Sequence, residues 1–242
     1  MKSALFIISI VTSLSIFGVT QVQQPMGDSI DGSVIAIVDG KTLLEKDRAN
    51  LRAVIFSELL NKYAKERKID TTEDEIDLFL RTKEEKENHA QKESEREKDH
   101  LLKELKNPSM SDATRLTIDS KLKTIEDSLR AAKEMKEGAE KMREQLRPMM
   151  RNMAKQWIMK WKINKSLYKK YGGRVVFQQT GVEPIDAYRD FLRDQEKAGS
   201  FKIMSEAEKV LFWDYFTNEK MHTFSEEKDA FRLIETPWWL LK

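Results

Sequence analysis

The sequence predicts a mainly α-helical protein, with a helical body, a short two-stranded β element and a long antiparallel helical hairpin arm inserted into the body. Three observations carry this prediction. Charged residues make up 35% of the 242 residues, and only 9 glycines and 5 prolines interrupt the chain, which is typical of long solvated helices. Apolar residues recur every three or four positions over most of the chain. Two short runs rich in β-branched residues, 34–38 and 174–179, predict the strands.

Residues 1–20 predict a signal peptide. Lys2 precedes the stretch 4–17, which is almost entirely apolar. This stretch is too short for a helix to cross a bilayer core of about 30 Å, but its length suits a signal sequence. We therefore expect a periplasmic or otherwise extracytoplasmic protein. The alternative is an uncleaved anchor, which also places the rest of the chain outside the cytoplasm.

The first part of the body is expected over 33–80. Asp39-Gly40 ends the first β-branched run and predicts a turn. Apolar residues spaced by three and four predict a helix over 44–68. Thr72 and Glu75 have the spacing of a capping box, so a second helix should begin directly after Thr72.

The arm is predicted over 81–147. Residues 81–100 contain one apolar side chain, Ala90, so we expect a helix held by ion pairs that contribute about 0.2–0.5 kcal/mol each. Pro148 is expected to kink or break the helix that returns to the body. The returning helix carries a heptad-like apolar seam, which consists of Ile118, Leu122, Ile125, Leu129, Ala132, Met135, Ala139, Met142 and Leu146.

Residues 148–242 are expected to complete the body. Gly172-Gly173 should end the helix that follows Pro148, and the strand 174–179 is expected to pair with 34–38. A helix over 183–197 should come next.

Two further features are expected near the C-terminus. Ser205 and Glu208 have the spacing of another capping box. The apolar run 237–241 is expected to dock on the core, and the alternative is an aromatic contact with a partner or a membrane.

The order of elements in 34–76 resembles the N-terminal domain of SurA-like periplasmic chaperones. The resemblance rests on Val34–Gly40, Leu59-Leu60, Lys65–Ile69 and Thr72–Ile76. It implies a client-binding body in which C-terminal helices complete the N-terminal fold. Members of this family usually carry parvulin prolyl-isomerase domains after this unit. A charged hairpin follows here instead, so isomerase activity is not expected.

Motifs for catalysis are absent from the sequence. It contains no P-loop, GxSxG, HExxH or dinucleotide-binding pattern. There is no cysteine, and the three histidines, His89, His100 and His222, lack the spacing of metal ligands. We expect a protein that is not an enzyme and has no cofactor or metal. An enzyme without a recognisable motif is the third functional alternative.

Positive charge is concentrated in 141–174, which holds eleven basic residues and one acidic residue, Glu144. A basic amphipathic helix can lie on an anionic membrane surface or bind an acidic partner. The alternative is pairing within the fold, for example with Asp186, Asp190 and Asp194. No nucleic-acid motif is present, so nucleic acid is not an expected partner. The predicted basic surface consists of Lys155, Lys162, Lys165 and Lys169.

Methionine is concentrated next to this charge, because six of the 11 methionines lie between 135 and 159. Methionine is flexible and polarizable, and it recurs on surfaces that accept varied partners. We therefore predict an apolar client-binding groove; the alternative is an ordinary hairpin or dimer core. The groove would consist of Leu129, Ala132, Met135, Met142, Met149, Met153, Trp157 and Trp161.

The function expected from these features is that of an exported ATP-independent chaperone. Unfolded or partly folded envelope proteins would be its clients, held in a cradle formed by the body and the arm. The alternative is a non-catalytic coiled-coil interaction or scaffold protein of the cell envelope. In that case the seam would form a homodimer or an adaptor interface.

Overall fold

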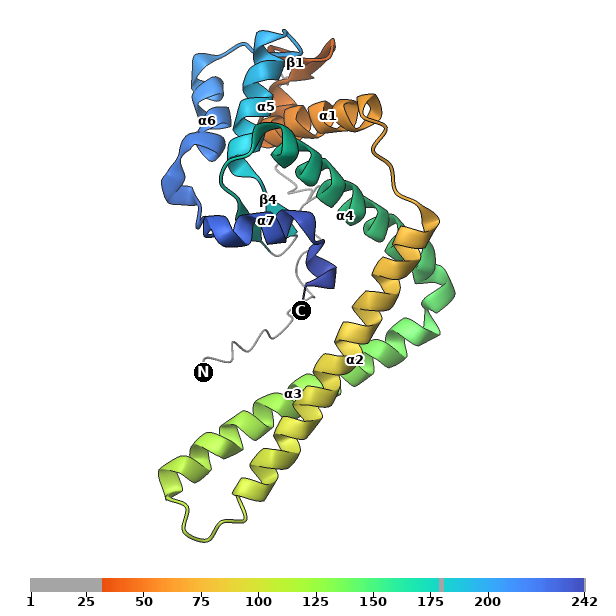
Figure 1. The fold of residues 1–242 in the computed structure, drawn as a ribbon, viewed down its shortest axis with the longest axis vertical. Coiled ribbons are helices and arrows are strands. Elements are labelled where there is room, and N and C mark those ends of the chain that lie inside the picture. Colours follow the sequence, from red (N-terminus) through yellow and green to blue (C-terminus); the bar gives the residue numbers. More distant parts are fainter. Residues whose placement is uncertain (1–31, 179–180, 242) are drawn as a thin grey trace.

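A computed structural model describes residues 32–178 and 181–241, so the predicted signal peptide lies outside the described residues. The predicted mainly helical fold is confirmed. The described part contains seven α-helices, a three-stranded sheet and a two-stranded sheet. Figure 1 shows a body from which a long helical hairpin projects. In the described ranges, no helix is both long and apolar enough to span a bilayer.

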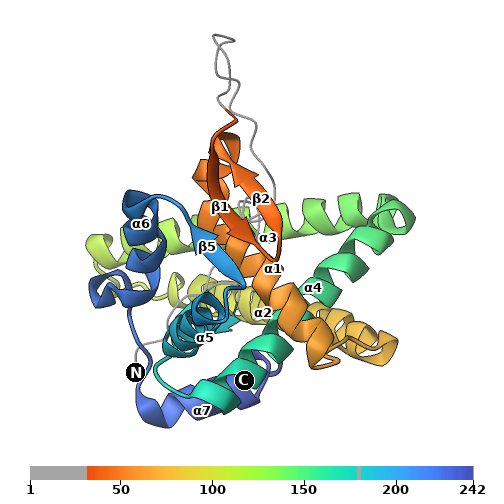
Figure 2. The same ribbon diagram turned by 90° about the horizontal axis from the view of Figure 1, so that it is seen from above.

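The three-stranded antiparallel sheet brings together distant parts of the chain (Figure 2). Its central strand, β1 (Val34–Val38), lies between β2 (Lys41–Leu44) and β5 (Phe201–Ile203). Asp39 and Gly40, with φ angles of 46° and 79°, form the turn between β1 and β2. An Asp-Gly pair with positive φ at both residues is the preferred two-residue hairpin turn.

The predicted pairing of 34–38 with 174–179 is wrong. β3 (Val176–Gln178) pairs instead with β4 (Gly181–Glu183) in a separate hairpin. A neighbouring partner closes a much shorter loop, at a smaller entropic cost, than one far away in the sequence. The predicted helix start at 44 is also wrong, because β2 and the 3-10 helix η2 (Glu45–Asn50) precede α1 (Leu51–Glu66).

The main core lies between the three-stranded sheet and four helices. These helices are α1, α4 (Arg143–Tyr171), α5 (Ile185–Lys197) and α6 (Glu206–Thr217). The core is built from aromatic and aliphatic side chains that recur every three or four positions on each helix. Its largest fully buried members include Ile55, Leu59, Leu167, Tyr188, Phe191, Phe201 and Phe212.

The arm consists of α2 (Glu73–Glu104) and α3 (Asp112–Lys141). The predicted capping box is present, because Thr72 N donates to Glu75 Oε2 at 2.8 Å and Glu75 N donates to Thr72 Oγ1 at 3.3 Å. α2 is continuous through the charged stretch 81–100, as predicted. Lys98 joins the two arm helices through an ion pair with Glu126 at 2.8 Å.

The first half of the α3 seam is buried. Ile118, Leu122 and Ile125 pack with Leu101 of α2 in a small core of their own, and Leu129 lies at its edge. Apolar residues are scarce on the part of α2 that faces the rest of the seam. The hairpin therefore has an apolar core near its tip and a polar contact closer to the body.

The break between α3 and α4 lies at Met142, upstream of the predicted site. Pro148 is inside α4, which continues past it. Of the two predicted outcomes, a break at Pro148 is therefore wrong, and a kink there stays a prediction. Gly138 lies one turn before the break, and glycine is a weak helix former. At the other end, the predicted stop is present, since Gly172 caps α4 with a φ of 68°.

The C-terminal region packs on the body and on the first turns of α2. It contains the short 3-10 helices η3 (Glu219–Met221) and η4 (Trp238–Leu240), with α7 (Glu227–Glu235) between them. The predicted capping box at the start of α6 does not form, because the Ser205 side chain makes no cap hydrogen bond. The carboxylate of Glu208 pairs with Arg48 of η2 instead.

Candidate interaction surface

Three of the predicted client-binding residues are large, exposed apolar side chains that follow one another along the turn from α3 to α4. Met135, Met142 and Met149, which we call the methionine stripe, are 53%, 49% and 54% exposed. Ala132 is also exposed, whereas Leu129 and Met153 are half-buried. The first part of the predicted groove is therefore open to solvent.

α2 presents polar side chains to the second half of α3, where Met135 lies. Lys136 Nζ donates to Asn88 Oδ1 at 3.2 Å, which bridges the two helices with a polar contact. A helix without an apolar face cannot bury the stripe of its neighbour. The polar composition of 81–100 thus leaves Met135 without an apolar cover from α2.

The second part of the predicted groove is covered by the chain itself. Trp157 and Trp161 pack with Phe79 and with residues 237–241, which we call the tail. The Trp161 ring centroid lies 5.8 Å from that of Trp239, and Phe79 lies 5.0 Å from the same ring. The expectation that the C-terminal run docks on the fold is therefore confirmed.

The indole of Trp161 also bonds to the segment before the tail. Its Nε1 donates to the backbone carbonyl of Ile234 in α7 at 2.9 Å. Lys165 Nζ lies 5.1 Å from the centroid of the same indole, within the range of a cation–π contact. Trp161 is thus held between α4 and the C-terminal region.

The predicted basic surface pairs mostly within the fold. Lys162 bonds to Glu75 at 2.6 Å, and both Lys165 and Lys169 reach Glu235, at 2.7 and 3.3 Å. These contacts tie α4 to the start of α2 and to the end of α7. Their geometry favours the alternative in which the basic face meets acidic groups of the same chain.

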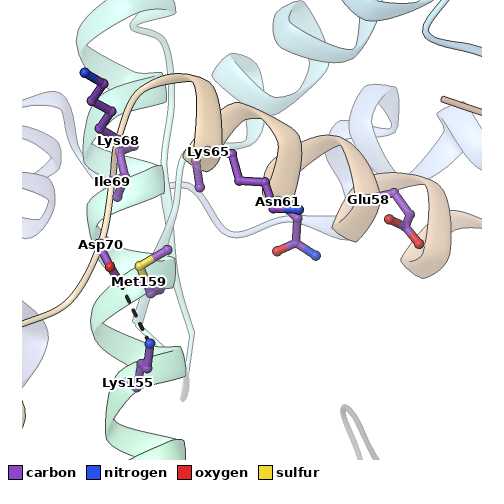
Figure 3. A pocket seen from close by; sticks show the side chains of 9 residues that line it. Glu58, Asn61, Lys65, Lys68, Ile69, Asp70, Lys155 and Met159 are labelled. Atoms are coloured by element: carbon purple, nitrogen blue, oxygen red, sulfur yellow. Dashed lines mark ion pairs between the residues drawn. The ribbon is translucent and has the colours of Figure 1, made fainter.

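Lys155 is the most weakly paired member of this set. Its ammonium lies 3.9 Å from a carboxylate oxygen of Asp70, and its side chain is 53% exposed. Figure 3 shows Lys155 and Met159 on one side of a hollow of about 590 Å³, opposite Asn61 and Glu58 of α1. This hollow mixes charged and apolar side chains and does not include the methionine stripe.

Asp186 is joined to the end of the basic segment through Arg174. Its carboxylate accepts hydrogen bonds from Arg174 N at 2.8 Å, Arg174 Nε at 2.9 Å and Arg189 Nη1 at 2.8 Å. Burial tends to raise the pKa of Asp186, but the hydrogen bonds from Arg174 and the charge of Arg189 outweigh it and lower the pKa. This cluster fixes the chain where it leaves α4.

The other two acidic residues expected to face the basic helix have different partners. Asp190 pairs with Arg189 at 3.0 Å and lies 3.7 Å from Arg193, both on its own helix. Asp194 accepts a hydrogen bond from the Tyr171 hydroxyl at 2.9 Å. One of the three predicted acids therefore forms an ion pair with the segment 141–174.

A buried polar group inside the body was not predicted. Asn164 is 1% exposed and lies on the inner face of α4. Its Nδ2 donates to the carbonyl of Val182 at 2.8 Å, and its Oδ1 accepts from the Tyr188 hydroxyl at 2.6 Å. Asn164 lies three residues after Trp161 and three before Leu167, which both belong to the apolar face. This spacing indicates that Asn164 is on the buried side of the helix.

Histidine and carboxylate side chains are the residues of this protein best suited to bind a metal ion. Within 32–178 and 181–241, no group of three or more such side chains could hold a metal ion. His222 Nε2 lies 2.6 Å from the carbonyl of Tyr215, and His89 and His100 are exposed on α2.

The methionine stripe, the aromatic cluster beneath the tail and the paired lysines together define the candidate surface. The chain matches no protein-family model, no curated protein and no solved structure. The resemblance of 34–76 to SurA-like chaperones therefore stays a prediction.

Proposed function

We propose that this protein is an exported ATP-independent chaperone that holds unfolded or partly folded envelope proteins. The observation that carries the proposal is the methionine stripe, which exposes three large apolar side chains where the arm that projects from the body returns to it. Such side chains bind apolar segments without directional contacts, so they accept many sequences. The resemblance of 34–76 to a chaperone family supports the same conclusion.

The stripe alone provides weak binding. Full burial of a methionine side chain contributes about 1.5–3 kcal/mol. Because each of the three is already about half-buried, a client gains about 2–4 kcal/mol from them. A micromolar complex needs about 8 kcal/mol, so a client must contact additional surface of the body or arm.

Suppression of aggregation tests the proposal. A chemically denatured substrate is diluted with and without the protein, and light scattering is recorded. We expect suppression at a several-fold excess of the protein, without ATP. Absence of suppression at that excess contradicts holding.

A triple variant links holding to the stripe. Replacement of Met135, Met142 and Met149 by glutamine removes the apolar groups, and glutamine keeps a high helix propensity. We expect this variant to suppress aggregation at least threefold less well, because a client can bury less apolar area on it. The matched control replaces Leu116, Val210 and Leu211 by glutamine. These three residues are 70%, 61% and 66% exposed. The control variant should suppress aggregation as well as the natural chain.

The scaffold alternative depends on a seam that is free to pair with another chain. Leu122 is 7% exposed and contacts the chain's own α2, so this part of the seam is already occupied. Photo-crosslinking from Met142 in the intact envelope separates the two functions. Many unrelated proteins as crosslinked products support a chaperone, whereas one dominant partner or self-crosslinks support a scaffold.

A further inference from the structure

We propose that the tail is a displaceable cover, and that an apolar client segment replaces it on the aromatic surface beneath. This inference rests on the proposed holding function and assigns a regulation to the same surface. The surface, which we call the aromatic seat, is formed by α2 and α4. It consists of Ile76, Phe79, Ala154, Trp157, Ile158 and Trp161.

The aromatic seat is separate from the main core. Its residues pack with one another and with the tail, whereas the core of the body is built around the three-stranded sheet, α1 and α5. Among tail residues, Trp239 is 5% exposed and Trp238 is half-buried. Displacement of the tail therefore uncovers the seat without opening the main core.

Few polar contacts hold the tail in place. In the described part of the chain, one hydrogen bond joins the tail to another element, from Lys86 Nζ to the carbonyl of Leu241 at 2.6 Å. The backbone N–H groups of Leu240 and Leu241 bond to carbonyls within the tail. The remaining contacts are apolar, and another apolar segment can make them equally well.

The seat continues the methionine stripe along one ridge of α4, which winds gradually around the helix. Met149, Met153, Trp157 and Trp161 follow one another at steps of four, which places them in one row along a helix. This row is about 18 Å long, at about 1.5 Å per residue. A client on the open seat would thus reach both the methionines and the tryptophans.

A cover in the same chain lowers the apparent affinity for clients. The affinity falls in proportion to the fraction of molecules with an open seat. A seat open in about 1–10% of molecules binds about 10–100-fold more weakly than an uncovered seat. The tail thereby restricts holding to clients that compete with it.

A labelled peptide with the sequence of residues 233–241 tests the cover directly. Its fluorescence anisotropy is measured with the full chain and with a variant that ends at Thr236. We expect the truncated variant to bind the peptide at least tenfold more tightly and to suppress aggregation at a lower excess. Circular dichroism tests whether the truncated variant is folded.

A locked variant tests the cover in a chain that keeps its tail. The chain has no cysteine, so Lys86→Cys and Leu241→Cys introduce the only two thiols, which a short bis-maleimide can join. Crosslinking should reduce binding of the labelled peptide at least tenfold relative to the unlinked double variant. The single variant Lys86→Cys, treated with the same reagent, is the control and should show no such loss.

The outcomes separate this inference from the proposed function. A folded truncated variant that binds the peptide no more tightly than the full chain overturns the cover. If truncation unfolds the protein, the locked variant decides, and unchanged peptide binding after crosslinking overturns the cover. If neither truncation nor crosslinking changes the suppression of aggregation, the proposed cover is contradicted and the chaperone function is not. Peptide binding that increases on truncation, without any suppression of aggregation, supports the cover and contradicts the chaperone function.

Discussion

The indole rings of Trp157 and Trp238 meet edge to face, with their centroids 5.5 Å apart and their planes at 66°. Trp157 belongs to the predicted client-binding groove, and Trp238 belongs to the tail. Edge-to-face aromatic pairs contribute about 0.5–1.5 kcal/mol beyond the burial of their surfaces. The protein therefore covers part of its own apolar surface with a segment that lies far away in the sequence.

Replacement of Leu122 by aspartate should unfold the tip of the arm. Leu122 is 7% exposed between α2 and α3, so an unpaired carboxylate there costs about 3–5 kcal/mol of local stability. Hydrogen exchange of the arm amides measures this loss. Leu116→Asp is the matched control, because Leu116 is on the same helix and 70% exposed; equal exchange in the two variants would refute the packing.

Replacement of Asn164 by alanine should destabilise the body by about 2–3 kcal/mol, because it leaves two buried polar groups without a partner. These groups are the Tyr188 hydroxyl and the Val182 carbonyl. Urea denaturation followed by circular dichroism measures the change in the free energy of unfolding. Asn152→Ala, at an exposed position of the same helix, should change it by less than about 0.5 kcal/mol.

Replacement of Gly173 by alanine should be more damaging than the same change at Gly172. Both glycines have positive φ, 90° and 68°, so both variants carry backbone strain. A Cβ on Gly173 would lie 2.4 Å from Cβ of Asp186, whereas a Cβ on Gly172 meets nothing within 4 Å. We expect the two variants to differ by about 1–3 kcal/mol in the free energy of unfolding. Equal thermal midpoints would show that the contact is unimportant.

Local sequence features predicted the parts of the fold that depend on neighbouring residues. The capping box of Thr72 and Glu75 and the stop at Gly172 are examples, since each is decided within one helical turn. The continuous helix through 81–100 was predicted in the same way. Pairing of β1 with β5 was not, because a strand carries no local mark of a distant partner.

The candidate surface shows the same limit. Met149 and Trp157 have equivalent places in the apolar row of α4, so periodicity alone predicts both as client-binding residues. Their exposure differs because the tail packs on Trp157, whereas Met149 lies outside that cluster and is 54% exposed. Such differences in exposure depend on where remote segments pack. The apolar pattern of a single helix holds no information about those segments.

The ion pairs of Asp186 should make the stability of the body depend on acid pH. The pKa of Asp186 lies below its ordinary value of 3.8, since hydrogen bonds from Arg174 and the charge of Arg189 outweigh the effect of burial. The unfolded chain therefore takes up this proton more readily than the folded chain. The resulting stabilisation is present above about pH 3.8 and is lost as the pH falls through the lower folded-state pKa.

Thermal midpoints measured by circular dichroism between pH 7 and pH 2 check this dependence. Asp186→Asn should melt below the natural chain at pH 7, and the difference should shrink as the pH falls below about 3.8. Asp99→Asn is the control, because Asp99 is exposed on α2 and has no ion pair in the part of the chain that the structure describes. A difference between the Asp186 variant and the natural chain that stays constant down to pH 2 would mean that the carboxylate charge does not stabilise the fold.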